Sequence, residues 1–83
     1  MIARLVLWNV ADTATSIDEL RAEPLPPTSG AAQEVWLADE SGERWGAFAL
    51  FPDADDAAAP LPERLRELLG KEPEIFELFD VAP

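Results

Sequence analysis

The chain has 83 residues with no cysteine, histidine or tyrosine, and its 17 acidic and 6 basic residues give a formal net charge of −11. This composition excludes disulfides, thiol or histidine catalysis and haem ligation by His or Cys, and it leaves a zinc site without its usual ligands. The negative charge disfavours binding to nucleic acid and to anionic membrane surfaces. No stretch approaches the ~20 apolar residues of a membrane span. We therefore expect one cytoplasmic domain over residues 1–83, with no metal and no cofactor.

The first predicted element is a strand over residues 2–10, which are rich in Ile, Val, Leu and Trp and contain no Gly or Pro. Alternation of side chains gives this strand two faces. One face carries Ile2, Arg4, Val6, Trp8 and Val10, and the other carries Ala3, Leu5, Leu7 and Asn9. A strand that is apolar on both faces is usually covered on both sides.

A short helix is predicted next over residues 16–23, where Ser16 and Glu19 have the spacing of a capping box. Three prolines follow within four positions, and proline lacks the backbone donor that a helix interior needs. The helix therefore ends there, and residues 24–32 are predicted to form a loop.

Residues 34–38 and 44–51 predict a β-hairpin. If Ser41 and Gly42 form a two-residue turn, Asp39 lies opposite Arg44, an opposite-charge pair that contributes about 0.2–1 kcal/mol. A three-residue loop with Gly42 as a bulge would shift this register, and both stay open. The first register places Trp36, Trp45, Ala47, Ala49 and Phe51 on one face, and Val35, Leu37, Phe48 and Leu50 on the other.

The last third of the chain predicts helical residues 53–59, a break at two prolines, a helix over residues 63–69 with Gly70 at its C-cap, and a strand over residues 74–81. The order strand, helix, strand, strand, helix, strand predicts an α+β ferredoxin-like βαββαβ fold with a four-stranded antiparallel sheet.

The second face of this sheet predicts a homodimer. The two helical regions are short and cover one face, whereas three of the strands are apolar on both faces. A second copy of the same sheet is the simplest cover for the other face. The alternative is a monomer in which loops, prolines and the C-terminal residues provide this cover.

Residues 34–53, from Glu34 to Asp53, resemble the central hairpin of the YdhR-like monooxygenase family. There a Val-Trp pair precedes a charged turn, small residues, an aromatic residue and an acidic residue that opens the second helix. The closing Phe79-Asp80-Val81 is similar to that family's last strand. The resemblance covers about residues 33–81 and, more weakly, residues 2–10.

This resemblance implies a dimeric α/β barrel and cofactor-independent oxygenation of aromatic or polyketide-like compounds. The chain departs from the family pattern in its first helix, because residues 24–30 replace the part that normally walls the pocket. Asn9 is a candidate catalytic residue because oxygenases of this superfold use an Asn on the first strand to orient substrate, and Trp36 is assigned with it. The candidate substrate-binding residues are Trp8, Trp45, Arg44 and Phe48, because large aromatic side chains wall pockets for flat ligands.

Each of these residues also has a simpler interpretation. Asn9 bonds a loop at the end of its strand, the tryptophans belong to the core or the dimer interface, and Arg44 pairs with Asp39. Glu77 and Asp80 lie in an apolar strand and are candidates for shifted pKa values. A strand end or an interface ion pair is the simpler explanation of these two carboxylates.

Two functions therefore stay open. The first is a small cofactor-free oxygenase or cyclase, which requires a cavity between sheet and helices lined by Asn9 and at least one tryptophan. The second is a non-catalytic dimeric binding or structural module, because a fold does not specify a function.

Overall fold

The computed structural model describes residues 1–25, 27–39 and 41–81. Its elements in chain order are β1 (Ile2–Asn9), α1 (Ile17–Ala22), β2 (Gln33–Ala38), β3 (Arg44–Phe51), α2 (Ala54–Ala58), α3 (Glu63–Leu69) and β4 (Ile75–Asp80). The strands form one antiparallel sheet in the order β2-β3-β1-β4. The predicted α+β fold with a four-stranded antiparallel sheet is thus confirmed, and this topology is compatible with a ferredoxin-like fold.

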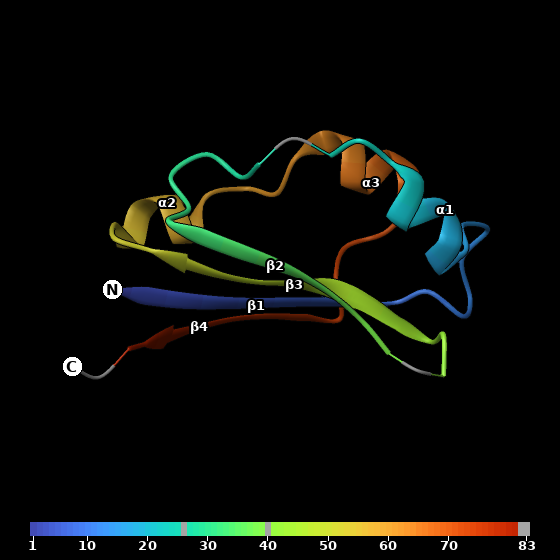
Figure 1. The fold of residues 1–83 in the computed structure, drawn as a ribbon, viewed down its shortest axis with the longest axis horizontal. Coiled ribbons are helices and arrows are strands. Elements are labelled where there is room, and N and C mark those ends of the chain that lie inside the picture. Colours follow the sequence, from blue (N-terminus) through green and yellow to red (C-terminus); the bar gives the residue numbers. More distant parts are fainter. Residues whose placement is uncertain (26, 40, 82–83) are drawn as a thin grey trace.

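The helices all lie on one side of the sheet (Figure 1). Two loops, one between α1 and β2 and one between α2 and α3, arch over the same side (Figure 1). We refer to this side as the covered face and to the other as the open face. No helix among the described residues is long and apolar enough to cross a membrane.

Local signals explain where the helices begin and end. The Ser16 hydroxyl accepts a hydrogen bond from the Glu19 amide at 3.2 Å, which is the N-terminal cap that the sequence predicts for α1. The Asp53 carboxylate caps α2 in the same way, accepting from the Asp55 amide at 2.8 Å. Gly70 ends α3 in the left-handed conformation, with a φ of 70°. Pro62, one of the two prolines of the predicted break, is the N-cap residue of α3.

The hairpin has the first of the two registers considered above. Trp36 pairs with Ala47, and the Asp39 amide donates to the Arg44 carbonyl at 2.9 Å. The predicted ion pair is also present, with 2.9 Å between Arg44 Nε and an Asp39 carboxylate oxygen. The turn itself differs from the prediction, because the Gly42 amide donates to the Asp39 carbonyl. Gly42 is therefore the last residue of the turn, and its φ of 76° returns the chain toward β3.

The covered face holds the core. Trp8 and Trp45 are each 2% exposed, and both lie beneath Leu20 of α1 and the two buried leucines of α3. The main cluster of buried residues is Val6, Trp8, Val10, Leu20, Trp45, Leu65 and Leu69. A smaller cluster joins Ala49 and Phe51 of β3 to Ala57 of α2. The predicted alternation along β1 is confirmed, since the residues assigned with Val6 and Trp8 lie on this face.

The open face is apolar and contacts no other element among the described residues. Val35 is 56% exposed, Phe48 38% and Phe79 48%, and these three side chains come from three different strands. The sheet registers place Leu5, Leu7, Leu37, Leu50 and Ile75 on the same side. Exposed apolar patches of this kind in a folded protein mark an interaction surface.

Gly46 is the position where the sheet tolerates no side chain. A Cβ there would lie 1.8 Å from the Val6 carbonyl oxygen and 2.9 Å from the Leu7 Cα. Both are backbone atoms of the neighbouring strand β1 and cannot rotate away. We expect Gly46→Ala to lower the free energy of unfolding by about 3 kcal/mol, measured by chemical denaturation.

Gly42→Ala is the matched control for this experiment. No atom lies within 4 Å of a Cβ at Gly42, so only the positive φ opposes the substitution. We expect the free energy of unfolding of this variant to fall by about 1 kcal/mol. Equal losses in the two variants would contradict the close approach of β1 and β3 at Gly46.

Candidate functional site

The best-formed aromatic site is a hollow on the covered face at the β2 edge, which we call the tryptophan cleft. It has a volume of about 310 Å³, within the size range of small-molecule sites. Its lining residues are Leu20, Arg21, Glu23, Pro24, Leu25, Trp36 and Trp45. One wall is thus α1 with the loop that follows it, and the other wall is formed by the two tryptophans on β2 and β3.

The tryptophans form a ladder across three neighbouring strands. The rings of Trp36 and Trp45 are stacked, with centroids 4.9 Å apart and an interplanar angle of 16°. The rings of Trp45 and Trp8 are 5.7 Å apart and tilted by 36°. Only Trp36, at the β2 edge, is substantially exposed, at 38%. The ladder is therefore anchored in the core and presents its outermost ring at the cleft.

Two charged side chains lie in the tryptophan cleft. The Glu23 carboxylate accepts a hydrogen bond from Arg64 Nε of α3 at 2.9 Å, and this bond raises the pKa of Arg64. Arg21 extends from α1, and no salt bridge engages it within the part of the chain that the structure describes. The cleft therefore combines an apolar, aromatic wall with one neutralised carboxylate and one guanidinium.

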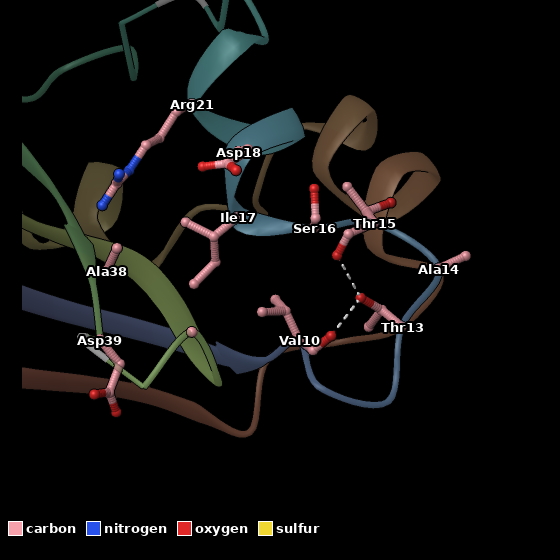
Figure 2. Close-up of a pocket in the computed structure, with 11 residues that line it drawn as sticks. Val10, Thr13, Ala14, Thr15, Ser16, Ile17, Asp18, Arg21, Ala38 and Asp39 are labelled. Carbon is pink, nitrogen blue, oxygen red and sulfur yellow. Dashed lines mark hydrogen bonds between the residues drawn. The ribbon is translucent and has the colours of Figure 1, made fainter.

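A second, more open hollow of about 620 Å³ lies beside α1 on the side of the β2–β3 turn (Figure 2). Its polar groups are mostly engaged within the protein. The Thr13 hydroxyl bonds the carbonyls of Val10 and Thr15, the Thr15 hydroxyl donates to Leu68, and Ser16 caps α1. This hollow has few polar groups left for a ligand, and we regard it as a neighbour of the tryptophan cleft rather than a separate site.

The two candidate catalytic residues lie on opposite faces of the sheet. Trp36 lines the tryptophan cleft, whereas Asn9 pairs with Arg44 at the end of β1 on the open face. The Asn9 side-chain oxygen accepts from the Ala11 amide at 3.0 Å, which is the loop-bonding role considered as its alternative. Among the residues that the structure describes, Asn9 and a tryptophan do not line a common cavity.

The four candidate substrate-binding residues are also separated. Trp45 lines the cleft, but Trp8 is buried and its indole donates to the Lys71 carbonyl at 3.2 Å. Phe48 lies on the open face. Arg44 is held by Asp39 beside a hollow of about 340 Å³, and its hydrogen bond lowers the pKa of that carboxyl.

Arg4 is the buried charge of the covered face, at 3% exposure. Its guanidinium lies 4.7 Å from the centroid of the Phe51 ring and 5.7 Å from that of Phe76, and burial lowers its pKa. Its Nε has no partner among the described residues, but Arg4 borders a void of about 10 Å³, the size of one water molecule. These contacts give Arg4 a structural role.

The remaining candidates do not form a catalytic centre. Glu77 and Asp80 are exposed on the edge strand β4. No group of three or more metal-binding side chains occurs in residues 1–25, 27–39 and 41–81. The sequence interpretation missed Leu20, Arg21 and Leu25 as cleft residues. The one available signal was that Ile17 and Leu20 share a face of the helix, and this pattern indicates packing against the core rather than a cleft.

No known protein family matches this chain, and no curated protein matches it significantly. The geometry described above is therefore the basis for assigning a function.

A cluster of three charged groups secures the end of β1. Lys71 Nζ lies 2.8 Å from an Asp12 carboxylate oxygen and 2.5 Å from one of Glu74, and Glu74 also accepts from the Asn9 amide at 2.7 Å. The hydrogen bonds that Lys71 donates lower the pKa of both carboxyls, and the same hydrogen bonds raise the pKa of Lys71. The two carboxyls therefore stabilise the fold at pH values above their ordinary pKa values. This stabilisation is lost as the pH falls through the lowered pKa values that they have in the folded protein.

We expect Lys71→Met to weaken the acid dependence of stability. Without Lys71 the pKa values of Asp12 and Glu74 move back toward those of the unfolded chain, so the free energy of unfolding falls less steeply as the pH is lowered below the ordinary carboxyl pKa values of about 4. Chemical denaturation at a series of pH values measures this slope. Arg21→Met removes the same charge outside the cluster and retains the original slope. An unchanged slope in Lys71→Met would show that the cluster does not carry the acid dependence.

Proposed function

We propose that this protein is a homodimeric binding module for small, flat aromatic ligands, with one tryptophan cleft in each protomer. The observation that carries this proposal is the stacked pair of Trp36 and Trp45 in the wall of the cleft. Aromatic ligands stack on such rings, and each well-placed aromatic pair contributes about 0.5–1.5 kcal/mol beyond the area it buries.

The contents of the cleft favour binding over catalysis. Among the described lining residues only Arg21 and Glu23 are charged, and the Glu23 carboxylate already accepts a hydrogen bond from Arg64. A guanidinium does not act as a base. The cleft lining therefore holds no activated nucleophile and no poised general base.

The open face supports the second copy in this proposal. Its apolar side chains come from all four strands, and the paired positions described on this face include one carboxylate, that of Glu77. Most acidic residues instead lie on the helices and loops of the covered side, such as Asp18, Asp55 and Glu63. Two copies can therefore approach through their open faces while their main negative charges stay apart. Such pairing would form the dimeric α/β barrel.

Cofactor-independent oxygenation of an aromatic compound is the second candidate function. It is favoured by the resemblance of residues 34–53 to the YdhR-like monooxygenases and by the aromatic lining of the cleft. In this case Asn9 would act at the dimer interface, because its side chain lies on the open face.

Replacement of Trp36 tests the ligand site. We expect the wild-type protein to bind 2-naphthamide, a flat neutral aromatic probe, and Trp36→Ala to bind it about tenfold more weakly because the stacking surface is lost. Isothermal titration calorimetry measures both affinities. Trp36 is an edge residue with substantial exposure, so the variant is expected to keep its fold, which far-UV circular dichroism checks.

Val35→Ala is the matched control, because Val35 is the preceding residue on β2 and faces the other side of the sheet. We expect it to retain the wild-type affinity. Absence of 2-naphthamide binding to the wild-type protein would overturn the proposed ligand site. Oxygen uptake that depends on an aromatic compound and on Trp36 would favour the oxygenase over the binding module.

Phe48→Glu tests the dimer. We expect the wild-type chain to elute at twice its mass of 9.1 kDa and this variant to elute as a monomer, because a charge in the middle of an apolar interface must be desolvated without a partner. Size-exclusion chromatography with light scattering measures the mass of each.

Ala54→Glu adds the same charge at an exposed position in the first turn of α2, on the covered side. We expect this control to remain a dimer. A wild-type particle of 9.1 kDa would reject the dimer, and a dimeric Phe48→Glu variant would place the interface elsewhere.

A further inference from the structure

We infer that the tryptophan cleft selects aromatic ligands that carry a carboxylate, and that Arg21 is the residue that recognises this group. The inference rests on the proposed function, because it names the chemical class of ligand for the same cleft. In the expected complex, the aromatic ring packs on the tryptophan wall and the carboxylate accepts hydrogen bonds from the Arg21 guanidinium, whose planar fork matches a carboxylate.

The first support is the distribution of ion pairs. Four of the six basic side chains take part in salt bridges, namely Arg44, Arg64, Arg66 and Lys71. A fifth, Arg4, is buried beneath the helices. Arg21 is exposed and has no salt bridge within the described parts of the chain, although acidic residues outnumber basic ones by 17 to 6. A guanidinium that pairs with none of the described carboxylates of so acidic a protein is available for one from a ligand.

The second support is the position of Arg21. It lines both the tryptophan cleft and the open hollow beside α1, so it lies where the two meet. Figure 2 shows its side chain extending from α1 on the side where Ala38 and Asp39 lie. A ligand whose ring occupies the aromatic end of the cleft can therefore place a substituent at Arg21 and remain accessible to solvent.

The local charge favours an anion over a cation. Glu23 is the one carboxylate in the described lining of the cleft, and Arg64 neutralises it at 2.9 Å. Within the described lining of the cleft itself, Arg21 then leaves a net positive charge. Asp18 and Asp39 line the neighbouring hollow, where Arg44 pairs with Asp39. A cationic ligand could stack on the tryptophans, but Arg21 would repel it. The overall charge of −11 repels any anion at long range, but salt screens this repulsion beyond about 8–10 Å. A direct contact with Arg21 is shorter than this screening length, so salt weakens it less.

Comparison of a charged and a neutral probe tests the inference. We expect 2-naphthoate to bind the wild-type protein about fivefold more tightly than 2-naphthamide, a gain typical of an exposed ion pair. In Arg21→Gln this preference is expected to disappear, so that 2-naphthoate and 2-naphthamide bind with equal affinity. Arg21→Lys retains the charge without the fork and is expected to keep part of the preference. Isothermal titration calorimetry at fixed ionic strength measures each affinity.

Arg66→Gln is the matched control, because it removes one exposed positive charge that pairs with Glu72 and does not line the cleft. We expect it to keep the full preference for 2-naphthoate. Equal binding of the two probes to the wild-type protein would overturn the role of Arg21 and leave the aromatic cleft in place. If Arg66→Gln also lost the preference for 2-naphthoate, the preference would depend on the net charge of the protein, and this result would also overturn the inference. Failure of both probes to bind would instead reject the proposed function itself.

Discussion

The helices of this protein are too short to cover more than one face of its sheet. They have six, five and seven residues, and all three lie on the same side. The four strands nevertheless carry apolar side chains on both faces. Burial of apolar surface is the main driving force for folding, so the side that the helices leave open is the expected place for association. The covered side, in turn, is packed tightly enough to leave only small voids beneath its centre.

The tryptophan ladder links the core to the candidate site. Trp8 and Trp45 are packed in the interior and fix the position of Trp36, which lies at the sheet edge beside α1. The wall of the cleft is therefore formed by a rigid strand pair rather than by a loop, and a rigid wall lowers the entropy cost of binding a flat ligand. The opposite wall is formed by α1, which contributes Leu20, and by the loop after it, which contributes Leu25.

Much of the fold was predictable because its signals are local. The caps of α1 and α2, the left-handed glycine after α3 and the pairing of Asp39 with Arg44 all depend on residues within five positions of each other. The site was less predictable. The alternation of side chains along the strand placed Trp8 and Asn9 on opposite faces of the sheet. The resemblance to oxygenases nevertheless assigned both residues to one candidate site. The structure agrees with the alternation. Arg21 was missed because its importance arises from the ion pairs made by the other basic residues.

The sequence by itself determined the order of strands and helices, the approximate ends of each and the apolar character of both sheet faces, because each follows from side-chain periodicity and from proline and glycine positions. The hairpin register stayed open between two turns, and the structure has the first of them. Only the tertiary structure decided which face the helices cover, which tryptophan reaches the surface and which guanidinium pairs with none of the described carboxylates. These properties depend on contacts between segments that are distant in the chain, such as Arg64 with Glu23 and Lys71 with Asp12, and short-range patterns do not encode such contacts.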